Sequence, residues 1–372
     1  MAMTHRQELL AAARKERLGK LPFGARVDLW YNYNSAHDTL PAKYRGWSMM
    51  NIMRALGIAA QYRYFSVVKE EFHDMEVIQK EEPPYVKTEF RTPLGSVQKS
   101  VLLTPSEGPW IGYEHEKLFK TEADYPIIRY VMEHTTPVPD PGYAKVSQEV
   151  GEDGLVMTGI GSWSAPQRVM REIMGYERFF YELMDRPEKV EELLETVKEL
   201  DNKKYEVALT SNLELYQVCS NWSDDIHTPV FKKYFLPLLQ ETVELLHAHG
   251  KLAMAHIDGE NRRLLPFLPD THIDVWEAWT PAPMTQVTNA ELRKALGDEA
   301  VIWGGVPATL FEPTYSDEEF DNYVINNLFK EIAPGYNFIV GLGDNLPFDG
   351  KIERVCRIAE LIERYGTLPI AM

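Results

Sequence analysis

Residues 251–280 read KLAMAHIDGENRRLLPFLPDTHIDVWEAWT, and two short apolar runs within them indicate the fold class. The first run, Lys251–Ile257, follows a helical segment that stops at Gly250. The second run, Ile273–Trp276, follows after a loop. Short apolar runs in this order are typical of buried strands in a protein that alternates helices and strands.

Three side chains with metal-binding chemistry stand at the carboxyl ends of these strands. His256 and Asp258 have the same parity, so they should project from the same face of the first strand, and Glu277 ends the second. Neutral imidazole and carboxylates suit zinc, which takes three protein ligands and keeps one open position in catalytic sites. We therefore predict His256, Asp258 and Glu277 as catalytic and metal-binding residues. The alternative is a buried histidine that is only hydrogen-bonded to a neighbouring carboxylate.

The alternation of strand and helix patterns continues through the rest of the chain. It runs from residue 154 to the end, and Arg26–Tyr31, RVDLWY, is predicted as a first strand before it. This pattern predicts an α/β fold in which residues 1–372 form one (β/α)8 TIM barrel domain. No glycine-rich nucleotide-binding motif follows a strand, which disfavours an open doubly wound sheet. We also expect an N-terminal helical extension at residues 1–25 and a β-hairpin insertion at residues 84–104.

The composition excludes several classes of partner. The chain has 56 acidic and 39 basic residues and a net charge of −17, which argues against a nucleic-acid-binding or membrane-binding surface. Its two cysteines, Cys219 and Cys356, are too few for a disulfide framework. The first 20 residues form a charged amphipathic pattern without the apolar core of a secretion signal. We expect a cytoplasmic protein.

Aromatic and amide side chains follow two of the predicted strands. The loop after the first strand reads YNYNSAHDTL, and Trp222 follows a strand predicted at Leu213–Cys219. Loops at the carboxyl ends of barrel strands commonly wall the active site. The predicted substrate-binding residues are Trp30, Tyr31, Asn32, Tyr33, His37 and Trp222, with Asn34 as a further hydrogen-bonding candidate.

The order of several short motifs resembles the uroporphyrinogen decarboxylase superfamily, which also contains zinc- and corrinoid-dependent methyltransferases. The motifs are VDLW (27–30), LPAKYR (40–45), GSWSAPQ (161–167), MDRPEKVEELL (184–194), SNWSDD (220–225), TPVFKKYFLP (228–237), HIDG (256–259) and GDEAVIWGGV (297–306). Each is weak alone, but together and in this order they cover most of the chain. The resemblance implies a (β/α)8 barrel.

The metal ligands of the methyltransferase members give a comparison with this chain. Those members use a His-x-Cys pair, a glutamate from the next strand and a later cysteine. His256 and Glu277 match this pattern, Asp258 replaces the first cysteine, and the late segment GLGDN has Leu342 or Gly343 in place of the second. A zinc ion bound by nitrogen and oxygen ligands is a harder Lewis acid than one bound by thiolates. Such an ion suits an oxygen-containing substrate.

The resemblance thus implies the methyltransferase I component of corrinoid-dependent O-demethylases. Such a protein would use Zn²⁺ to transfer a methyl group from an aryl methyl ether to the Co(I) corrinoid of a partner protein. A Glu-x14-Glu-x20-His zinc motif is described for this group, and Glu191, Glu206 and His227 have that spacing. On one helix, however, the two glutamates would lie roughly 22 Å apart, too far for one zinc ion. His227 and Cys219 remain additional candidate metal ligands.

Three other functions are considered. The first is a uroporphyrinogen decarboxylase-like lyase, which is disfavoured because no arginine occurs between Arg26 and Arg45 to bind porphyrin carboxylates. The second is a methyltransferase acting on methanol or a methylamine. The third is a noncatalytic barrel that binds no metal. Members of the superfamily are often monomeric or dimeric, and we expect a homodimer.

Overall fold

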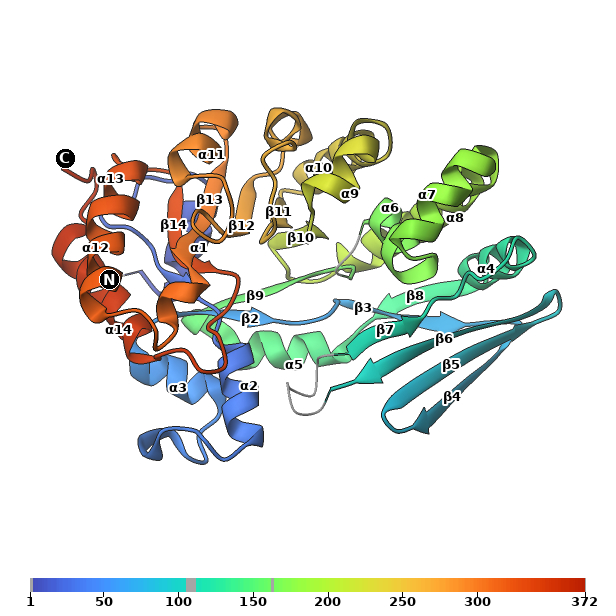
Figure 1. The fold of residues 1–372 in the computed structure, drawn as a ribbon, viewed down its shortest axis with the longest axis horizontal. Helices are drawn as coiled ribbons and strands as arrows, with labels where there is room; N and C mark the ends of the chain where they lie inside the picture. Colours follow the sequence, from blue (N-terminus) through green and yellow to red (C-terminus); the bar gives the residue numbers. More distant parts are fainter. Residues whose placement is uncertain (1–2, 105–111, 162–163, 372) are drawn as a thin grey trace. The chain divides into compact units, whose positions relative to one another are not determined.

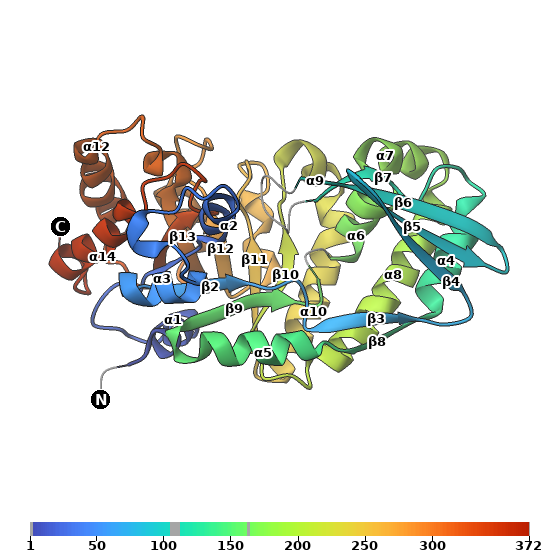
Figure 2. The same ribbon diagram turned by 90° about the horizontal axis from the view of Figure 1, so that it is seen from below.

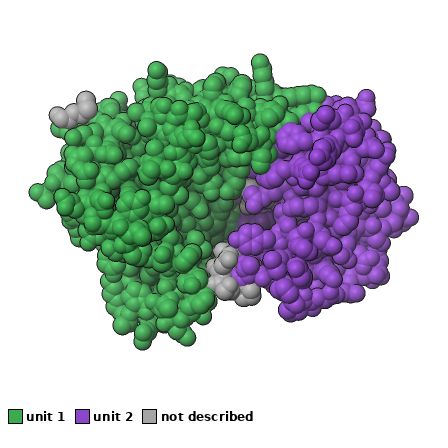
Figure 3. All heavy atoms as spheres, viewed as in Figure 1, with its two compact units in different colours: residues 1–64, 142–158, 213–372 green, residues 65–141, 159–212 purple. Residues whose placement is uncertain are grey.

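The computed structural model describes residues 3–104, 112–161 and 164–371. The chain folds into two compact units, which are coloured separately in Figure 3. Unit 1 contains residues 1–64, 142–158 and 213–372, and unit 2 contains residues 65–141 and 159–212.

Unit 1 is built on a sheet of eight parallel strands. In sheet order they are β1 (Gly24–Ala25), β2 (Ala59–Arg63), β9 (Gly154–Gly159), β10 (Leu215–Ser220), β11 (Leu252–His256), β12 (Val275–Trp279), β13 (Val301–Pro307) and β14 (Phe338–Gly343). The sheet returns to its first strand, since Phe23 pairs in parallel with Val340, whose N–H donates to Pro22 O at 2.9 Å. The predicted α/β fold of the TIM barrel type is therefore confirmed.

Helices of unit 1 connect the strands and lie on the outer side of the sheet (Figures 1 and 2). They are α3 (Met49–Leu56), α5 (Pro141–Val150), α9 (Asp224–Val230), α10 (Leu236–Ala248), α11 (Asn289–Leu296), α12 (Asp317–Asn322), α13 (Phe329–Ile332) and α14 (Glu353–Tyr365). Local sequence defines where they start. In α11, Thr288 and Glu291 form a capping box that satisfies N–H groups of the first turn. No helix in the described ranges is long and apolar enough to cross a membrane.

The N-terminal helix α1 (His5–Ala13) contributes directly to the barrel core. A capping box between Thr4 and Gln7 starts it, and its Leu9 side chain is fully buried. One apolar cluster joins this helix to the barrel strands and includes Leu9, Leu10, Ala12, Ala13, Leu155, Met157, Leu215, Met254, Val275, Val301, Trp303 and Ile339. Many of these strand residues stand near the amino ends of their strands. Helix α1 therefore fills the amino end of the barrel interior.

The prediction of a strand at Arg26–Tyr31 is wrong. The strand is only Gly24–Ala25, and Asp28–Ala36 form helix α2. Trp30 and Asn34 stand one helical turn apart and are both buried, which is a helical and not an alternating burial pattern. Asp28 in the first turn also suits the helix dipole.

Unit 2 contains two small antiparallel sheets and several helices. Strand β3 (Val68–Phe72) pairs with β8 (Thr135–Pro139), and the other sheet contains β4 (Glu76–Glu82), β5 (Tyr85–Thr92), β6 (Gly95–Leu103) and β7 (Gly112–Glu116). The helices are α4 (Asp124–Glu133), α6 (Ala165–Arg168), α7 (Tyr176–Asp185) and α8 (Pro187–Ala208). The segment 84–104, where a hairpin is expected, contains β5 and β6.

An ionic network joins β3, α6 and α8 within unit 2, and its members Arg168, Asp201 and Lys204 are buried, whereas Glu70 is partly exposed. Arg168 contacts Asp201 at 2.8 Å, and Lys204 pairs with Glu70 and lies 4.0 Å from Asp201. Burial by itself would raise the pKa of Glu70, but the positive charges of Lys204 and Arg168 hold it below its ordinary value. The ionised form of Glu70 therefore stabilises the fold.

We predict that Leu9→Ala lowers the free energy of unfolding by about 2–5 kcal/mol, because it leaves a cavity in the barrel core. Leu94→Ala is the matched control, since Leu94 is 56% exposed. Urea denaturation followed by circular dichroism measures the free energy of unfolding of both variants and of wild type. Equal losses in the two variants would contradict the role assigned to α1.

Glu70→Gln is predicted to destabilise the protein at neutral pH by about 1 kcal/mol or less, because the Glu70 side chain is 38% exposed and water screens the pair. The pKa of Glu70 is lower in the folded than in the unfolded chain. Its contribution is therefore present above its ordinary pKa of 4.5 and is lost as the pH falls through the folded value. Thermal unfolding of wild type and variant should converge in this acidic range. A difference that persists unchanged at low pH would contradict the assignment.

A candidate metal centre at the carboxyl ends of the barrel strands

A histidine and a glutamate form a buried pair across two neighbouring barrel strands. The parallel register of β11 and β12 sets His256 opposite Glu277, and the two side chains are 3% and 1% exposed. His256 Nδ1 lies 2.6 Å from Glu277 Oε2, and Gln61 Nε2 donates to Glu277 Oε1 at 3.4 Å. An ionised carboxylate only accepts hydrogen bonds, so Glu277 favours the tautomer with the proton on Nδ1. The Nε2 lone pair of His256 is then available on the other edge of the ring.

Two further carboxylates stand at that other edge. His256 Nε2 lies 3.4 Å from Asp344 Oδ1 and 3.8 Å from Asp258 Oδ2. One ligand atom from each of these residues lies within 4.8 Å of the others. Metal–ligand bonds of about 2.0–2.1 Å set neighbouring ligands of a tetrahedral zinc ion about 3.4 Å apart. The three side chains are thus arranged so that they could hold a metal ion.

Neighbouring side chains fix the orientation of both aspartates. Asn221 Nδ2 donates to the two carboxylate oxygens of Asp258 at 3.0 Å each. Arg26 Nη1 donates to Asp344 Oδ1 at 2.5 Å, and the same guanidinium is bonded to Asp28. Such outer hydrogen bonds orient metal ligands and adjust their basicity.

Within the described part of the chain, carboxylates outnumber guanidiniums around the site. Burial raises the pKa of Asp258, and the nearby Asp344 and Glu277 add to this effect. Although burial would also raise the pKa of Asp344, the cations around it, Arg26 first, hold it below its ordinary value. Among the described residues, the four carboxylates of Asp28, Asp258, Glu277 and Asp344 face the two guanidiniums of Arg26 and Arg63. A divalent cation would neutralise the remaining charge.

Unusual backbone conformations also gather at this end of the barrel. Asn221 after β10, Ala278 in β12 and Asp344 after β14 have φ angles of 51°, 57° and 84°. This region is unfavourable for residues other than glycine, most clearly for alanine. Ala278 directly follows Glu277, where the β12–β13 register shifts between Trp276 and Trp279. Strain of this kind typically occurs where function fixes the position of a side chain.

His256 and Asp258 belong to the group that could hold a metal ion, whereas the other predicted metal ligands, Glu277, His227 and Cys219, lie in three different environments. Glu277 contacts His256 from the side opposite to the two aspartates and is not one of the three residues that could share an ion. His227 is buried on α9, where its Nδ1 accepts the N–H of Ser223 at 2.9 Å and its ring packs against Phe235. Cys219 pairs with Ala255 and therefore faces away from His256, which pairs with Ser220. Burial raises the pKa of its thiol well above the ordinary value.

The predicted aromatic substrate residues are divided between α2 and a separate aromatic cluster. In α2, Trp30 is buried, Tyr31 and Asn32 are half-buried, and the hydroxyl of Tyr31 donates to Trp47 O at 2.9 Å. Tyr33 lies against Phe348 and stacks on the exposed His37, with ring centres 4.8 and 4.1 Å apart. Trp222 is buried, and its ring contacts in the described part of the chain are with Phe231, Phe235 and Trp276.

Asn34 has a structural role, because its side chain bonds to backbone carbonyl groups. Its side-chain amide donates to Trp30 O and Phe348 O, at 2.8 and 2.7 Å. These bonds join α2 to the loop that follows β14.

The glutamates of the Glu-x14-Glu-x20-His spacing lie on one unbroken helix. Glu191 and Glu206 are both exposed on α8, which extends from Pro187 to Ala208. A continuous helix separates them by roughly 22 Å. They cannot bind the same zinc ion.

Several residues of the site were not identified from the sequence. The most important is Asp344, which follows β14 directly in GLGDN. The signal that led to His256 and Asp258, a charged side chain at a strand end, was present there as well. Asn221, Arg26 and Gln61 had no comparable signal, because their roles depend on contacts with distant parts of the chain.

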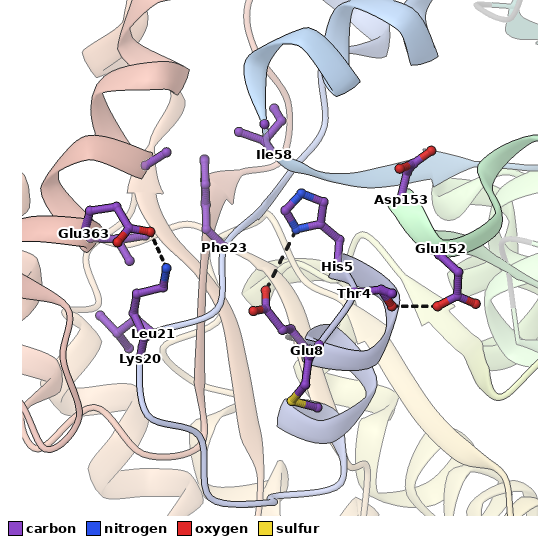
Figure 4. A pocket seen from close by; sticks show the side chains of 14 residues that line it. Thr4, His5, Glu8, Lys20, Leu21, Phe23, Ile58, Glu152, Asp153 and Glu363 are labelled. Atoms are coloured by element: carbon purple, nitrogen blue, oxygen red, sulfur yellow. Dashed lines mark hydrogen bonds and ion pairs between the residues drawn. The ribbon is translucent and has the colours of Figure 1, made fainter. Parts of the chain in front are cut away.

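An open pocket of about 410 Å³ lies at the opposite end of the barrel, beside α1 (Figure 4). Its carboxylates are bonded within the protein: Glu152 accepts from Thr4 at 2.6 Å, and Glu363 pairs with Lys20. The pocket is near the amino ends of β1, β2 and β9, whereas barrel enzymes carry out their chemistry at the carboxyl ends. We assign no function to it.

The fold and the site together define an α/β barrel protein with a candidate metal centre at the carboxyl ends of its strands. Residues 145–365, more than half of the chain, match the uroporphyrinogen decarboxylase (URO-D) family model, and the chain belongs to this family. Among solved structures, a methyltransferase from Methanosarcina mazei has the same fold, with a TM-score of 0.62 and 11% sequence identity over 98% of this chain and 99% of that one. The comparison with curated proteins found no match.

We predict that the purified protein binds about one zinc ion per chain and that His256→Ala and Asp344→Asn abolish binding, because the first removes a ligand atom and the second removes the negative charge of a ligand. His227→Ala is the matched control and should retain the metal. Elemental analysis after dialysis against zinc measures all four proteins. Loss of zinc from the His227 variant alone would place the centre on α9 instead.

Proposed function

We propose that this protein is a zinc-dependent methyltransferase that moves a methyl group from an aryl methyl ether to the Co(I) corrinoid of a partner protein. The observation that supports this proposal is the group of His256 Nε2 and the carboxylates of Asp258 and Asp344 at the carboxyl ends of β11 and β14. All three ligand atoms are nitrogen or oxygen. Such a shell makes a hard Lewis acid, which favours an ether or alcohol oxygen over a thiol.

When bound there, zinc would polarise the ether oxygen and stabilise the phenolate that leaves. The residues of the chain prepare the site for this chemistry. Glu277 holds the proton of His256 on Nδ1, so that Nε2 can act as a ligand. Arg26 keeps Asp344 ionised, and Asn221 holds Asp258 in place. Each would act through a metal ligand and is therefore a positioning residue.

Family and fold are consistent with this function. The structural neighbour from Methanosarcina mazei is itself a methyltransferase, and its fold matches over nearly the whole of both chains. The family also contains decarboxylases, whose porphyrin substrate carries many carboxylates. In this chain the segment between Arg26 and Arg45 contains no arginine and carries Trp30, Tyr31 and Tyr33. An arene suits such a segment better than a polycarboxylate.

The methyl acceptor would be delivered by another protein. A corrinoid is too large to enter a barrel of this size, which is filled by side chains. We infer that its carrier binds across the carboxyl ends of the strands and presents the cobalt to the methyl carbon. The exposed side chains of Trp47, Phe348 and Met284 belong to loops at or near this end.

Mixing the zinc-loaded protein, a Co(I) corrinoid protein and methoxybenzene should produce methylated cobalt, which is followed by its absorbance spectrum. Glu277→Gln is expected to reduce zinc affinity or methyl transfer about 10- to 100-fold, because the ligand histidine loses its orienting carboxylate. Glu206→Gln, an exposed glutamate on α8, is the matched control and should behave as wild type.

Two outcomes would contradict the proposal. Demethylation of the ether without any corrinoid protein would exclude the proposed acceptor. Turnover of uroporphyrinogen by metal-free protein would assign a decarboxylase instead.

A further inference from the structure

Arg63 is a charged side chain of the barrel interior that the proposed chemistry does not use. It is the last residue of β2, and its register partner is Met157, which belongs to the interior apolar cluster. Gln61, two residues earlier on the same strand, bonds to Glu277. Because side chains two positions apart share a face, Arg63 projects into the barrel above Gln61, toward the carboxyl end.

Among the described residues, one buried nitrogen of the Arg63 guanidinium has no hydrogen-bond acceptor. Its Nη1 is buried, and no hydrogen-bond acceptor for it is found among the residues that the structure describes. The carboxylates nearby are already engaged: Asp28 and Asp344 accept from Arg26, and Glu277 contacts His256. A buried donor on a cation is costly to leave without a partner.

Burial and the neighbouring Arg26 disfavour the charge of Arg63 more than the nearby carboxylates of Glu277, Asp344 and Asp28 support it, so that an anion bound directly to its guanidinium would stabilise the charged form. Burial lowers the pKa of Arg63, and the neighbouring positive charge of Arg26 lowers it further. Two guanidiniums thus lie close together beside the candidate metal ligands. A guanidinium presents its N–H groups as a planar fork that matches the two oxygens of a carboxylate.

We propose that Arg63 binds a carboxylate on the methyl donor, so that the preferred substrates are aryl methyl ethers that carry an acidic group on the ring. This inference rests on the proposed function, because it names the substrate class of the same site. The ether oxygen would face His256, Asp258 and Asp344, while the carboxylate is held at the end of β2. The two contacts at opposite ends of the ring would fix the direction in which the methyl group points.

Calorimetric titration tests the carboxylate site without any methyl transfer. Benzoate and its neutral counterpart benzyl alcohol are titrated into wild type, Arg63→Gln and Arg63→Lys, each with and without zinc. Wild type should prefer benzoate. Arg63→Gln should weaken benzoate binding about 10- to 100-fold and leave benzyl alcohol unchanged. Arg63→Lys should recover part of the loss, because it keeps the charge but not the fork.

The matched control is Arg54→Gln, which removes an arginine from a surface ion pair with Asp153 and should bind benzoate as wild type does. Benzoate binding that requires zinc and is unaffected by Arg63→Gln would make the carboxylate a metal ligand and overturn the proposal. Equal binding of benzoate and benzyl alcohol by wild type would overturn it as well.

Turnover separates this inference from the proposed function. Methyl transfer to the corrinoid protein is compared for 3-methoxybenzoate and 3-methoxybenzyl alcohol. If benzoate binds through Arg63 but neither ether reacts, the carboxylate site stands and the methyltransferase function fails. If both ethers react equally in wild type and in Arg63→Gln, the function stands and the role of Arg63 is refuted.

Discussion

The contact between His256 Nδ1 and Glu277 Oε2 is the interaction on which the candidate site depends. It joins β11 to β12 in the interior of the barrel, where both side chains are almost completely buried. In such an environment an ion or a dipole needs a specific partner, because water is not there to replace it. Glu277 provides that partner on one edge of the imidazole ring. The other edge is then free to face Asp258 and Asp344.

The barrel converts this local pair into a larger site because parallel strands end at the same edge of the sheet. Asn221, Glu277 and Asp344 belong to the ends of β10, β12 and β14, and two of them adopt backbone angles that are unfavourable outside glycine. The cost of each such residue is about 1–3 kcal/mol. The well-packed strands and the apolar cluster around α1 stabilise the fold and offset this backbone strain.

Charge is the property that separates the two ends of the barrel interior. Near the amino ends of the strands the cluster around Leu9, Met254 and Val275 is entirely apolar. Near the carboxyl ends, arginines and carboxylates accumulate, and the carboxylates are in excess among the described residues. A divalent cation and an acidic substrate group would engage different members of this set. Metal binding at His256 and anion binding at Arg63 can therefore coexist at the same end of the barrel.

The sequence by itself determined the fold class and pointed to the candidate site. Alternating helix and strand patterns predicted the barrel, and the parity of His256 and Asp258 with the strand-end position of Glu277 located the candidate centre, because strand periodicity is a local property. Tertiary structure alone decided the first two strands of the barrel and the contacts between residues far apart in the chain, because local patterns do not contain this information. The two-residue strand β1 and helix α2 were misassigned, and β2 was not recognised, since Gln61 and Arg63 interrupt its apolar alternation. Asp344 joined His256 only through closure of the sheet, which brings together residues far apart in the chain.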